Sequence, residues 1–184
     1  MKKIKLKDNV FMDRFELSHA KELFELIDTN RDYLKTFMHW PRFTLSPEDT
    51  LSFIKSSHKS EEEGSWVFGI FVDDKIAGVC SFNSTNKTNL KTEIGYWIAE
   101  NYQGQGLVTL ACKELIRIGM EEFKLNRIGI LCSTLNIPSQ NIPKRLGFSL
   151  EGTLRNNEVV GDQIYDHHVY GLTKEDYINF KEKK

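Results

Sequence analysis

The fold of this chain follows from residues Glu93–Val108, which read EIGYWIAENYQGQGLV. An apolar stretch typical of a β-strand leads into a polar turn with two glycines, and a long apolar pattern follows. Gly104 and Gly106 allow left-handed backbone angles because they carry no Cβ atom. The apolar residues of Leu107–Phe123 recur every three or four positions, which predicts a helix packed broadly against a sheet.

The start of that predicted helix can bind an anion. Its first N–H groups have no partner inside the helix, and the helix dipole adds partial positive charge there. A phosphate group therefore fits beside the turn. Because a Gly-x-Gly sequence also occurs in ordinary strand-to-helix turns, both interpretations stay open at this point.

Length and charge exclude several classes of protein. The 184 residues predict a single domain spanning 1–184, and 25 Lys+Arg against 26 Asp+Glu give a net charge of -1. Such a balance provides no bulk attraction to nucleic acid or to a membrane surface. Met1–Asp8 is basic but never reaches the apolar run of a signal peptide, and Cys80, Cys112 and Cys132 are widely spaced in apolar surroundings. These features predict a soluble cytoplasmic protein with buried free thiols.

The remaining patterns predict a mixed α/β (α+β) fold. Strands are expected at Val10–Leu17, Trp66–Val72, Ile76–Phe82, Arg127–Ser133, Phe148–Glu151 and Ile164–Leu172, in addition to the strand of the opening stretch. Helices are expected after an N-cap at Ser18, at Arg31–Phe37, from Pro47 to about Glu63, at Pro138–Leu146 and at Thr173–Phe180. The polar segment Arg155–Asp162 is expected to form a turn region. This order predicts one mixed, mostly antiparallel sheet of about seven strands, with helices on both faces and a parallel pair in the middle.

Two motifs make the chain resemble the GNAT-type N-acetyltransferases over nearly its full length. Gln103–Val108 resembles the family's Arg/Gln-x-x-Gly-x-Gly/Ala loop, and Asn136–Phe148 resembles its Asn-x-x-Ser…Lys-Leu-Gly-Phe segment. The likeness extends to the ribosomal-protein serine/alanine N-acetyltransferases through Glu93–Ile98, Leu150–Gly152 and Tyr165–Tyr170. The resemblance implies the acyl-CoA N-acyltransferase fold.

The resemblance also implies a reaction. Acetyl-CoA is the expected co-substrate, no metal is expected, and the acetyl group is expected to move directly to a primary amine. The N-terminal α-amine of a ribosomal or other protein is the leading acceptor. The alternative acceptor is a polyamine or another small amine. The alternative function is a non-catalytic module that senses acyl-CoA. The oligomeric state stays open, and exposed aromatic residues such as Trp40 could serve a homodimer.

The expected cofactor contacts are mostly main-chain groups. Tyr96, Trp97 and Ile98 are expected to pair with the pantetheine arm as an added strand would. The pyrophosphate is expected to bind the N–H groups of the loop, whose residues are Gln103, Gly104, Gln105, Gly106, Leu107 and Val108. Asn136 is expected to bond the pantetheine amides, and Lys144 belongs to the same cofactor-binding segment.

Three residues are candidates for proton transfer. Ser139 matches the family position that protonates the leaving thiolate, although an Asn-x-Pro-Ser sequence also caps helices well. Glu158 is the expected base and Glu93 its competitor, with a base acting through water as a further option. Adjacent strand residues point to opposite faces, so His167 and His168 are expected to be structural and not to form a metal or triad site.

Two residues depart from the family pattern. Val108 stands where the family has Gly or Ala, which is expected to move the first helical turn slightly away from the phosphates. Pro143 falls inside a predicted helix, where it removes a hydrogen bond and is expected to cause a kink. The segment His39–Arg42 is expected to form either a lid over the acceptor or an aromatic anchor.

Overall fold

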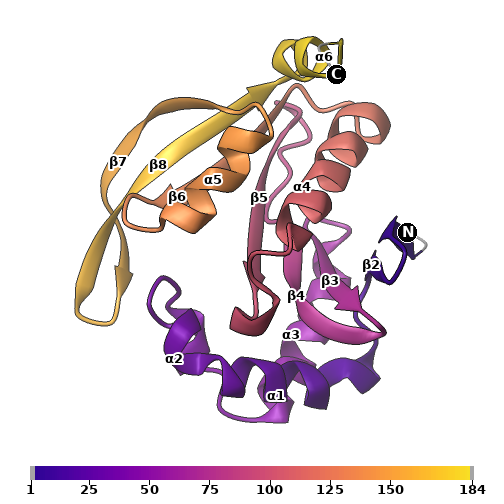
Figure 1. Ribbon diagram of the computed structural model, residues 1–184, viewed down its shortest axis with the longest axis vertical. Coiled ribbons are helices and arrows are strands. Elements are labelled where there is room, and N and C mark those ends of the chain that lie inside the picture. The colour runs from indigo at the N-terminus through magenta and orange to yellow at the C-terminus, as the bar shows by residue number, and fades with distance from the viewer. Residues whose placement is uncertain (1–2, 183–184) are drawn as a thin grey trace.

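The protein, described here by a computed structural model for residues 3–182, is built on one eight-stranded sheet (Figure 1). Its order is β1-β2-β3-β4-β5-β6-β8-β7. The strands are β1 Ile4–Lys7, β2 Val10–Asp13, β3 Trp66–Val72, β4 Lys75–Phe82, β5 Lys91–Ile98, β6 Arg127–Ser133, β7 Ser149–Val160 and β8 Gln163–Thr173. Neighbouring strands are antiparallel except β5 and β6, which are parallel. The predicted mixed, mostly antiparallel sheet with a central parallel pair is confirmed.

The predicted number of about seven strands was one too low. The additional strand, β1, lies at the edge of the sheet and reads IKLK, with partly buried residues alternating with exposed lysines. Such a short basic edge strand gives a weak apolar signal, although lysines are common there because they discourage pairing with other chains. The strand predicted at Val10–Leu17 was too long, because β2 ends at Asp13 and a 3-10 turn occupies Leu17–His19.

Helices cover both faces of the sheet, as predicted. They are α1 Ala20–Thr29, α2 Arg31–Leu34, α3 Pro47–Ser60, α4 Leu107–Arg117, α5 Ile137–Arg145 and α6 Lys174–Glu182. One buried cluster joins α1 and α3 to the sheet, and a larger one joins α4 and α5 to it. The helix predicted from Pro47 is confirmed and begins with a capping box between Ser46 and Asp49, whereas the predicted N-cap at Ser18 is not a cap, because the turn before α1 is closed by Glu16 and His19.

The turn region predicted at Arg155–Asp162 is wrong, because β7 continues through it to Val160 and the hairpin turns at Gly161. β7 is the outer strand of the sheet and most of its side chains are exposed, so its polar residues gave no strand signal. The pairing register shifts between Leu154 and Glu158, where three residues of β7 oppose one of β8. The β7–β8 hairpin is therefore long and carries a bulge near its tip.

The two parallel strands separate partway along their length. β5 and β6 pair only from Lys91 to Glu93 on β5, opposite Arg127 to Gly129 on β6. Beyond Glu93, β5 pairs with β4 alone, while β6 continues beside β8. The sheet is therefore open in its middle, between the end of β5 and the end of β6 (Figure 1).

Candidate active site

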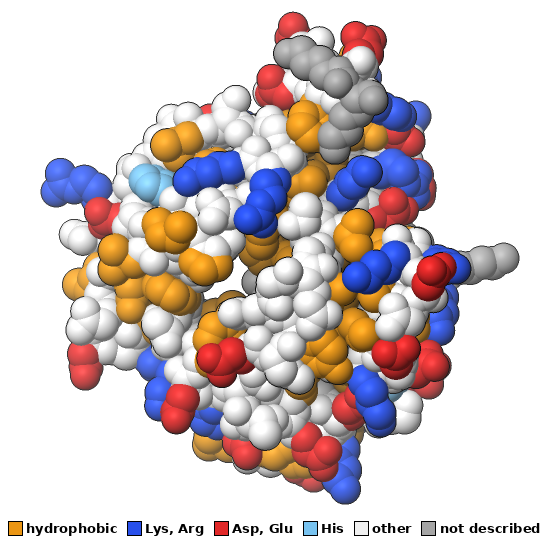
Figure 2. Space-filling view, in the orientation of Figure 1, with side chains coloured by type: hydrophobic (Ala, Val, Ile, Leu, Met, Phe, Trp, Pro, Cys, Tyr) orange, Lys and Arg blue, Asp and Glu red, His pale blue; other side chains and the backbone are white. Residues whose placement is uncertain are grey.

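A cavity of about 680 Å³ lies where β5 and β6 separate. Its walls come from segments far apart in the sequence. They include Met38, His39 and Trp40 before α3, Tyr96 and Trp97 of β5, Cys132 of β6, Asn136 and Ser139 of α5, Glu158 of β7 and His167 of β8. The space-filling view is hollowed between the β7–β8 hairpin and the side of the molecule that carries α4 (Figure 2).

The glycine loop before α4 has the geometry of an anion site. Gly104 and Gly106 both have φ +72, and Gly106 is the N-cap of α4. A Cβ atom at either position would meet nothing within 4 Å, so the left-handed angle and not crowding is what favours glycine. Residues 103–106 of the loop are exposed and lie at the positive end of a helix of eleven residues. These residues fit a diphosphate group.

Side chains around the loop point away from the space that a phosphate would need. Leu107 and Val108 are both buried in the core beneath α4, so the bulk of the valine lies on the inner side of the helix. The side-chain amide of Gln103 donates to the Tyr33 hydroxyl, and Gln105 donates to the carbonyl of Asn101 at 3.3 Å. These contacts hold the loop in shape from its flanks.

The end of β5 provides an edge for an extended ligand. Tyr96 and Trp97 line the cavity, whereas Ile98 packs against the core. Since β4 occupies one edge of β5 and β6 has moved away from the other, main-chain groups on the second edge face the cavity. The Trp97 ring packs on Trp40 at a centroid distance of 5.7 Å. Trp40 is thus half-buried and is not the exposed aromatic residue that a dimer contact required.

The first turn of α5 faces β5 across the cavity. The Asn136 Oδ1 accepts from the Ser139 N–H at 3.2 Å, so Asn136 does cap the helix, and both side chains also line the cavity. The Ser139 hydroxyl lies 3.3 Å from the Cys132 sulfur. Lys144 is exposed on α5 and is not part of the lining. α5 continues through Pro143 to Arg145 as one helix.

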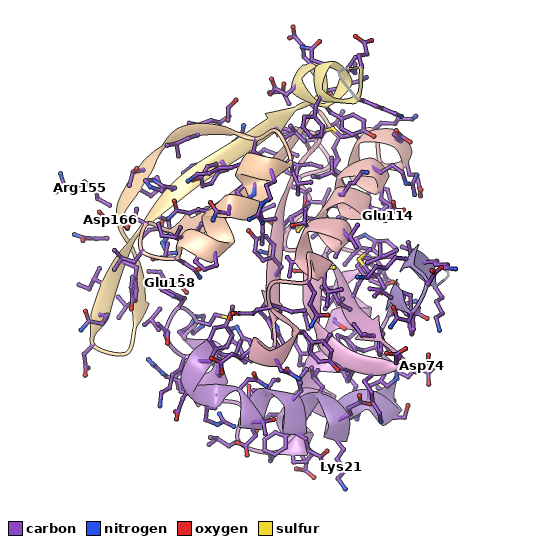
Figure 3. All side chains as sticks on the ribbon, in the orientation of Figure 1. Lys21, Asp74, Glu114, Arg155, Glu158 and Asp166 are labelled. Carbon is purple, nitrogen blue, oxygen red and sulfur yellow. The ribbon has the colours of Figure 1, made fainter. Side chains whose placement is uncertain are left out.

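Glu158 reaches the cavity from the bulge in β7. Asn156 has φ 51, and its N–H donates to the Asp166 carboxylate at 2.8 Å, which holds the bulge in place. Bulges re-aim the side chains that follow them. In Figure 3 the Glu158 side chain points from the hairpin toward the side on which α2 lies. Its two oxygens lie 3.3 Å from His39 Nδ1 and 3.2 Å from His167 Nε2.

The two glutamates predicted as alternative bases lie in different places. Glu158 lines the cavity, but the structure does not bring Glu93 there. Glu93 is exposed and belongs to the short stretch in which β5 still pairs with β6, opposite Gly129. The geometry therefore separates Glu158 from its competitor.

His167 lies in the wall of the cavity, and the structural role expected for it stays a prediction. It is 7% exposed, contacts Glu158 through Nε2, and its Nδ1 is buried without a hydrogen-bond partner in the described part of the chain. His168 instead lies 2.9 Å from the Thr153 hydroxyl. His39 belongs to the segment expected to form a lid or an anchor, but the sequence did not reveal its contact with Glu158, because 119 positions separate the two residues. Predicting that Glu158 contacts His39 and His167 would have required the pairing register at the β7 bulge.

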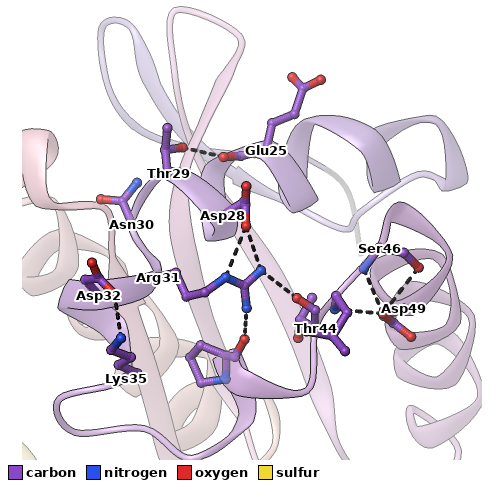
Figure 4. A network of polar contacts seen from close by, with 12 residues as sticks. Glu25, Asp28, Thr29, Asn30, Arg31, Asp32, Lys35, Thr44, Ser46 and Asp49 are labelled. Carbon is purple, nitrogen blue, oxygen red and sulfur yellow. Dashed lines mark hydrogen bonds and ion pairs between the residues drawn. The ribbon is translucent and has the colours of Figure 1, made fainter.

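A network centred on Arg31 fixes the segment that carries His39 and Trp40 (Figure 4). The Arg31 guanidinium bonds to Asp28 at 2.8 Å, to the Thr44 carbonyl at 2.7 Å and to the Pro41 carbonyl. Arginine suits this task because its planar group donates in several fixed directions. The segment is therefore a wall of the cavity as well as an aromatic anchor.

Burial affects the protic groups beside Ser139. It raises the pKa of the Tyr96 hydroxyl well above its usual range, and it also raises the pKa of the Cys132 thiol. Both groups therefore stay protonated near neutral pH. Within residues 3–182 no group of three or more His, Cys, Asp or Glu side chains is arranged to hold a metal ion. None of the helices in that range has the length and apolar character needed to cross a membrane.

Comparison with known proteins agrees with this geometry. Residues 9–149 match the model of the acetyltransferase (GNAT) domain. The ribosomal-protein-serine acetyltransferase of Escherichia coli (strain K12) is 34% identical over 168 residues, 91% of this chain and 94% of that protein. Among solved structures, the microcin C7 self-immunity acetyltransferase MccE in complex with acetyl-CoA and AMP is 34% identical, with a TM-score of 0.88 over 92% of this chain and 95% of that one.

A second solved structure has the same overall shape. It is RimL, a ribosomal L7/L12 α-N-protein acetyltransferase in complex with coenzyme A, which is 26% identical, with a TM-score of 0.90 over 94% of this chain and 98% of that one. The predicted family and fold are confirmed. The chain belongs to the GNAT acetyltransferase family, and it is an N-acetyltransferase that uses acetyl-CoA as its co-substrate.

Proposed function

We propose that this enzyme acetylates the N-terminal α-amine of a protein, with a ribosomal protein as the leading acceptor and the cytoplasm as its place of action. The observation that carries this proposal is the position of Glu158 of β7 and Ser139 of α5 in the lining of one cavity. Similarity to a ribosomal-protein-serine acetyltransferase supports the choice of acceptor.

In this proposal Glu158 is the base. The attacking amine must lose a proton as it forms the bond to the acetyl carbon, and a carboxylate held by two imidazoles can accept that proton directly or through water. His39 and His167 fix the carboxylate from two different elements. A positioned acid or base of this kind contributes roughly 10²–10⁴-fold to the rate.

Ser139 is the proposed acid. When the bond between the acetyl carbon and sulfur breaks, its electron pair goes to sulfur, and the serine hydroxyl can donate a proton there. The main-chain groups of β5 that face the cavity are the proposed partners of the pantetheine amides, and N–H groups at the same strand end would stabilise the oxyanion. Loop residues Gln103–Val108 would hold the pyrophosphate, with Asn136 and Lys144 nearby on α5.

The charge of the cavity supports an amine acceptor over a phosphate-bearing one. Among the residues that line it, Asp49 and Glu158 are acidic and none is Lys or Arg. A cationic peptide N-terminus is attracted to such a site, and a nucleotide phosphate is repelled. Small amines share this preference, so polyamines remain the main alternative.

The test is a direct assay of acetyl transfer. Purified protein is mixed with acetyl-CoA and short peptides that begin with Ser or Ala, and free thiol and peptide mass are measured. The same peptides with a formylated N-terminus and an internal Lys are the matched control, because they offer only a side-chain amine. We expect thiol release and one added acetyl group with the free peptides alone.

Parallel reactions separate the alternatives. Thiol release only with spermidine or other small amines would overturn the peptide acceptor and leave the enzyme class intact. Acetylation of an aminoacyl nucleotide in preference to the peptides would overturn the electrostatic reasoning. Tight acetyl-CoA binding without turnover on any amine would favour a sensor.

A further inference from the structure

Three protic side chains meet beside the opening of the sheet. The Tyr96 hydroxyl donates to the main-chain carbonyl of Ser139 at 3.0 Å, and the Ser139 hydroxyl lies 3.3 Å from the Tyr96 oxygen. The Ser139 hydroxyl is also 3.3 Å from the Cys132 sulfur, which lies 3.7 Å from the Tyr96 oxygen. A tyrosine of β5 therefore contacts both the backbone and the side chain of the proposed acid.

Pro143 explains why this carbonyl is open to a side chain. In an α-helix the carbonyl of a residue accepts from the N–H four positions later. For Ser139 that position is Pro143, which has no N–H. A buried carbonyl without a partner is costly, and the Tyr96 hydroxyl supplies the missing donor. The proline that departs from the family pattern is thus matched by a tyrosine on a different element.

The direction of these hydrogen bonds is fixed by chemistry. A carbonyl oxygen can only accept, so the Tyr96 hydrogen points to it. The Tyr96 oxygen is then left to accept, and the Ser139 hydroxyl can donate to it. Since burial keeps the pKa of Tyr96 well above its usual range, the tyrosine retains its own proton. The single Ser139 hydrogen must turn from Tyr96 to the sulfur during transfer, so Tyr96 holds the serine in place without replacing it as the acid.

The same contact spans the gap between the two strands. Tyr96 lies three positions beyond Glu93, where pairing with β6 ends, and Ser139 lies on α5, which follows β6. No main-chain ladder joins β5 to β6 at this level. The hydroxyl of Tyr96 is therefore a bridge across the opening in which the thioester must lie.

We infer that Tyr96 is a positioning residue for Ser139, and that Pro143 leaves free the carbonyl through which it acts. This inference rests on the proposed function, in which Ser139 donates its proton to the departing sulfur. The serine then recovers a proton from solvent, and Glu158 releases to solvent the proton that it took from the amine. One proton is gained and one lost, and Tyr96 exchanges none.

The test is a kinetic double-mutant cycle of Tyr96→Phe and Ser139→Ala, measured as thiol release with whichever amine the wild-type enzyme acetylates. We expect Tyr96→Phe to lower kcat on the order of tenfold and to change the KM for acetyl-CoA less than about twofold. In the Ser139→Ala background the same change should alter kcat less than about twofold, because Tyr96 acts through the serine.

The matched control is Tyr170→Phe. The Tyr170 hydroxyl also bonds to α5, at 3.4 Å from the Gln140 side chain, but it does not contact Ser139. Tyr96→Phe and Tyr170→Phe therefore each remove one hydroxyl that bonds to α5, but only Tyr96→Phe removes a contact with Ser139. Tyr170→Phe should leave kcat within about twofold of wild type, and circular dichroism would verify that every variant is folded.

The outcomes separate this inference from the proposed function. An unchanged kcat in Tyr96→Phe, equal losses in both serine backgrounds, or an equal loss in Tyr170→Phe would overturn the positioning role alone. An unchanged kcat in Ser139→Ala would overturn the acid role of the proposed function, and the inference would fail with it.

Discussion

The two sides of the cavity are built in different ways. The proposed cofactor side consists of β5, the Gln103–Val108 loop and the start of α4, which form one continuous stretch of chain. The proposed acceptor side consists of the β7–β8 hairpin and the His39 segment, which meet through contacts between residues 119 positions apart. The cofactor side presents main-chain groups at fixed backbone angles, whereas the acceptor side presents side chains. The sequence predicted the first side as a continuous motif because its geometry is local.

The largest expected effect is on the acceptor side. Glu158→Gln keeps the shape of the side chain but removes the base, so kcat should fall by roughly 10²–10⁴-fold. The affinity for acetyl-CoA, measured by calorimetry, should not change. Glu93→Gln should leave kcat nearly at the wild-type value, because that residue lies on the closed part of the sheet. The reverse result would mean that the catalytic base lies on the cofactor side.

The next effect belongs to the cofactor side. Gly106→Ala puts a Cβ atom on a residue with φ +72, which costs about 1–2 kcal/mol. If acetyl-CoA binding requires this angle, its dissociation constant should rise by about fivefold to thirtyfold with little change in kcat. Gly152→Ala is the control, since that glycine has open space around it and no left-handed angle. Equal losses in both variants would show that the loop angle is not what binds the cofactor.

A smaller effect is expected where the acceptor side is anchored. Arg31→Ala removes the bonds to Pro41 and Thr44 and should loosen the segment that carries His39. Charged hydrogen bonds of this kind contribute about 1.5–3 kcal/mol, of which a part should appear as a severalfold higher KM for the acceptor. Acetyl-CoA affinity should stay constant.

The control for that variant is Lys35→Ala. Lys35 pairs with Asp32 on the surface, where ion pairs contribute little. The Lys35→Ala substitution should therefore alter neither the KM for the acceptor nor the affinity for acetyl-CoA. If Arg31→Ala weakens acetyl-CoA as much as the acceptor, the two sides of the cavity are not independent.

The smallest effect concerns the contact between Tyr96 of β5 and Ser139 of α5. Tyr96→Phe should destabilise the protein by about 1–3 kcal/mol, because the Ser139 carbonyl loses its donor. In a Pro143→Ala background a helical N–H is restored, and the same change should cost about 1 kcal/mol less. Urea unfolding of the four proteins measures this coupling. A coupling of zero would mean that the proline and the tyrosine act separately.

Much of the fold was predictable for local reasons. The β3–β4 hairpin, β6 and the start of α3 carry apolar runs or a capping box that identify them within a few residues. β1 and most of β7 were not predictable in this way, because edge strands exposed to solvent have no apolar pattern to show. The glycine loop was predicted from a local signal as well, namely two glycines between a strand pattern and a helix pattern.

The acceptor side could be predicted only as a list of candidates. Glu158 was the expected base and Glu93 its competitor, and they differ in the structure because Glu158 lines the cavity whereas Glu93 lies where β5 still pairs with β6. His167 was expected to be structural because His167 and His168, as adjacent strand residues, point to opposite faces. The bulge at Asn156 nevertheless brings Glu158 into contact with His167. Such relations belong to strand register, which a single sequence does not specify.

The separation of β5 from β6 also bears on solubility. An unpaired strand edge ordinarily invites another chain to add to it, and proteins that leave such an edge exposed tend to aggregate. Here the open edge of β5 beyond Glu93 lies inside the molecule, walled by α5 and by the β7–β8 hairpin. A second protein chain is kept away from it, whereas a thin flexible molecule with amide groups can enter. An unpaired strand edge placed in the centre of the molecule is thereby shielded from the pairing between chains that it would invite at the surface.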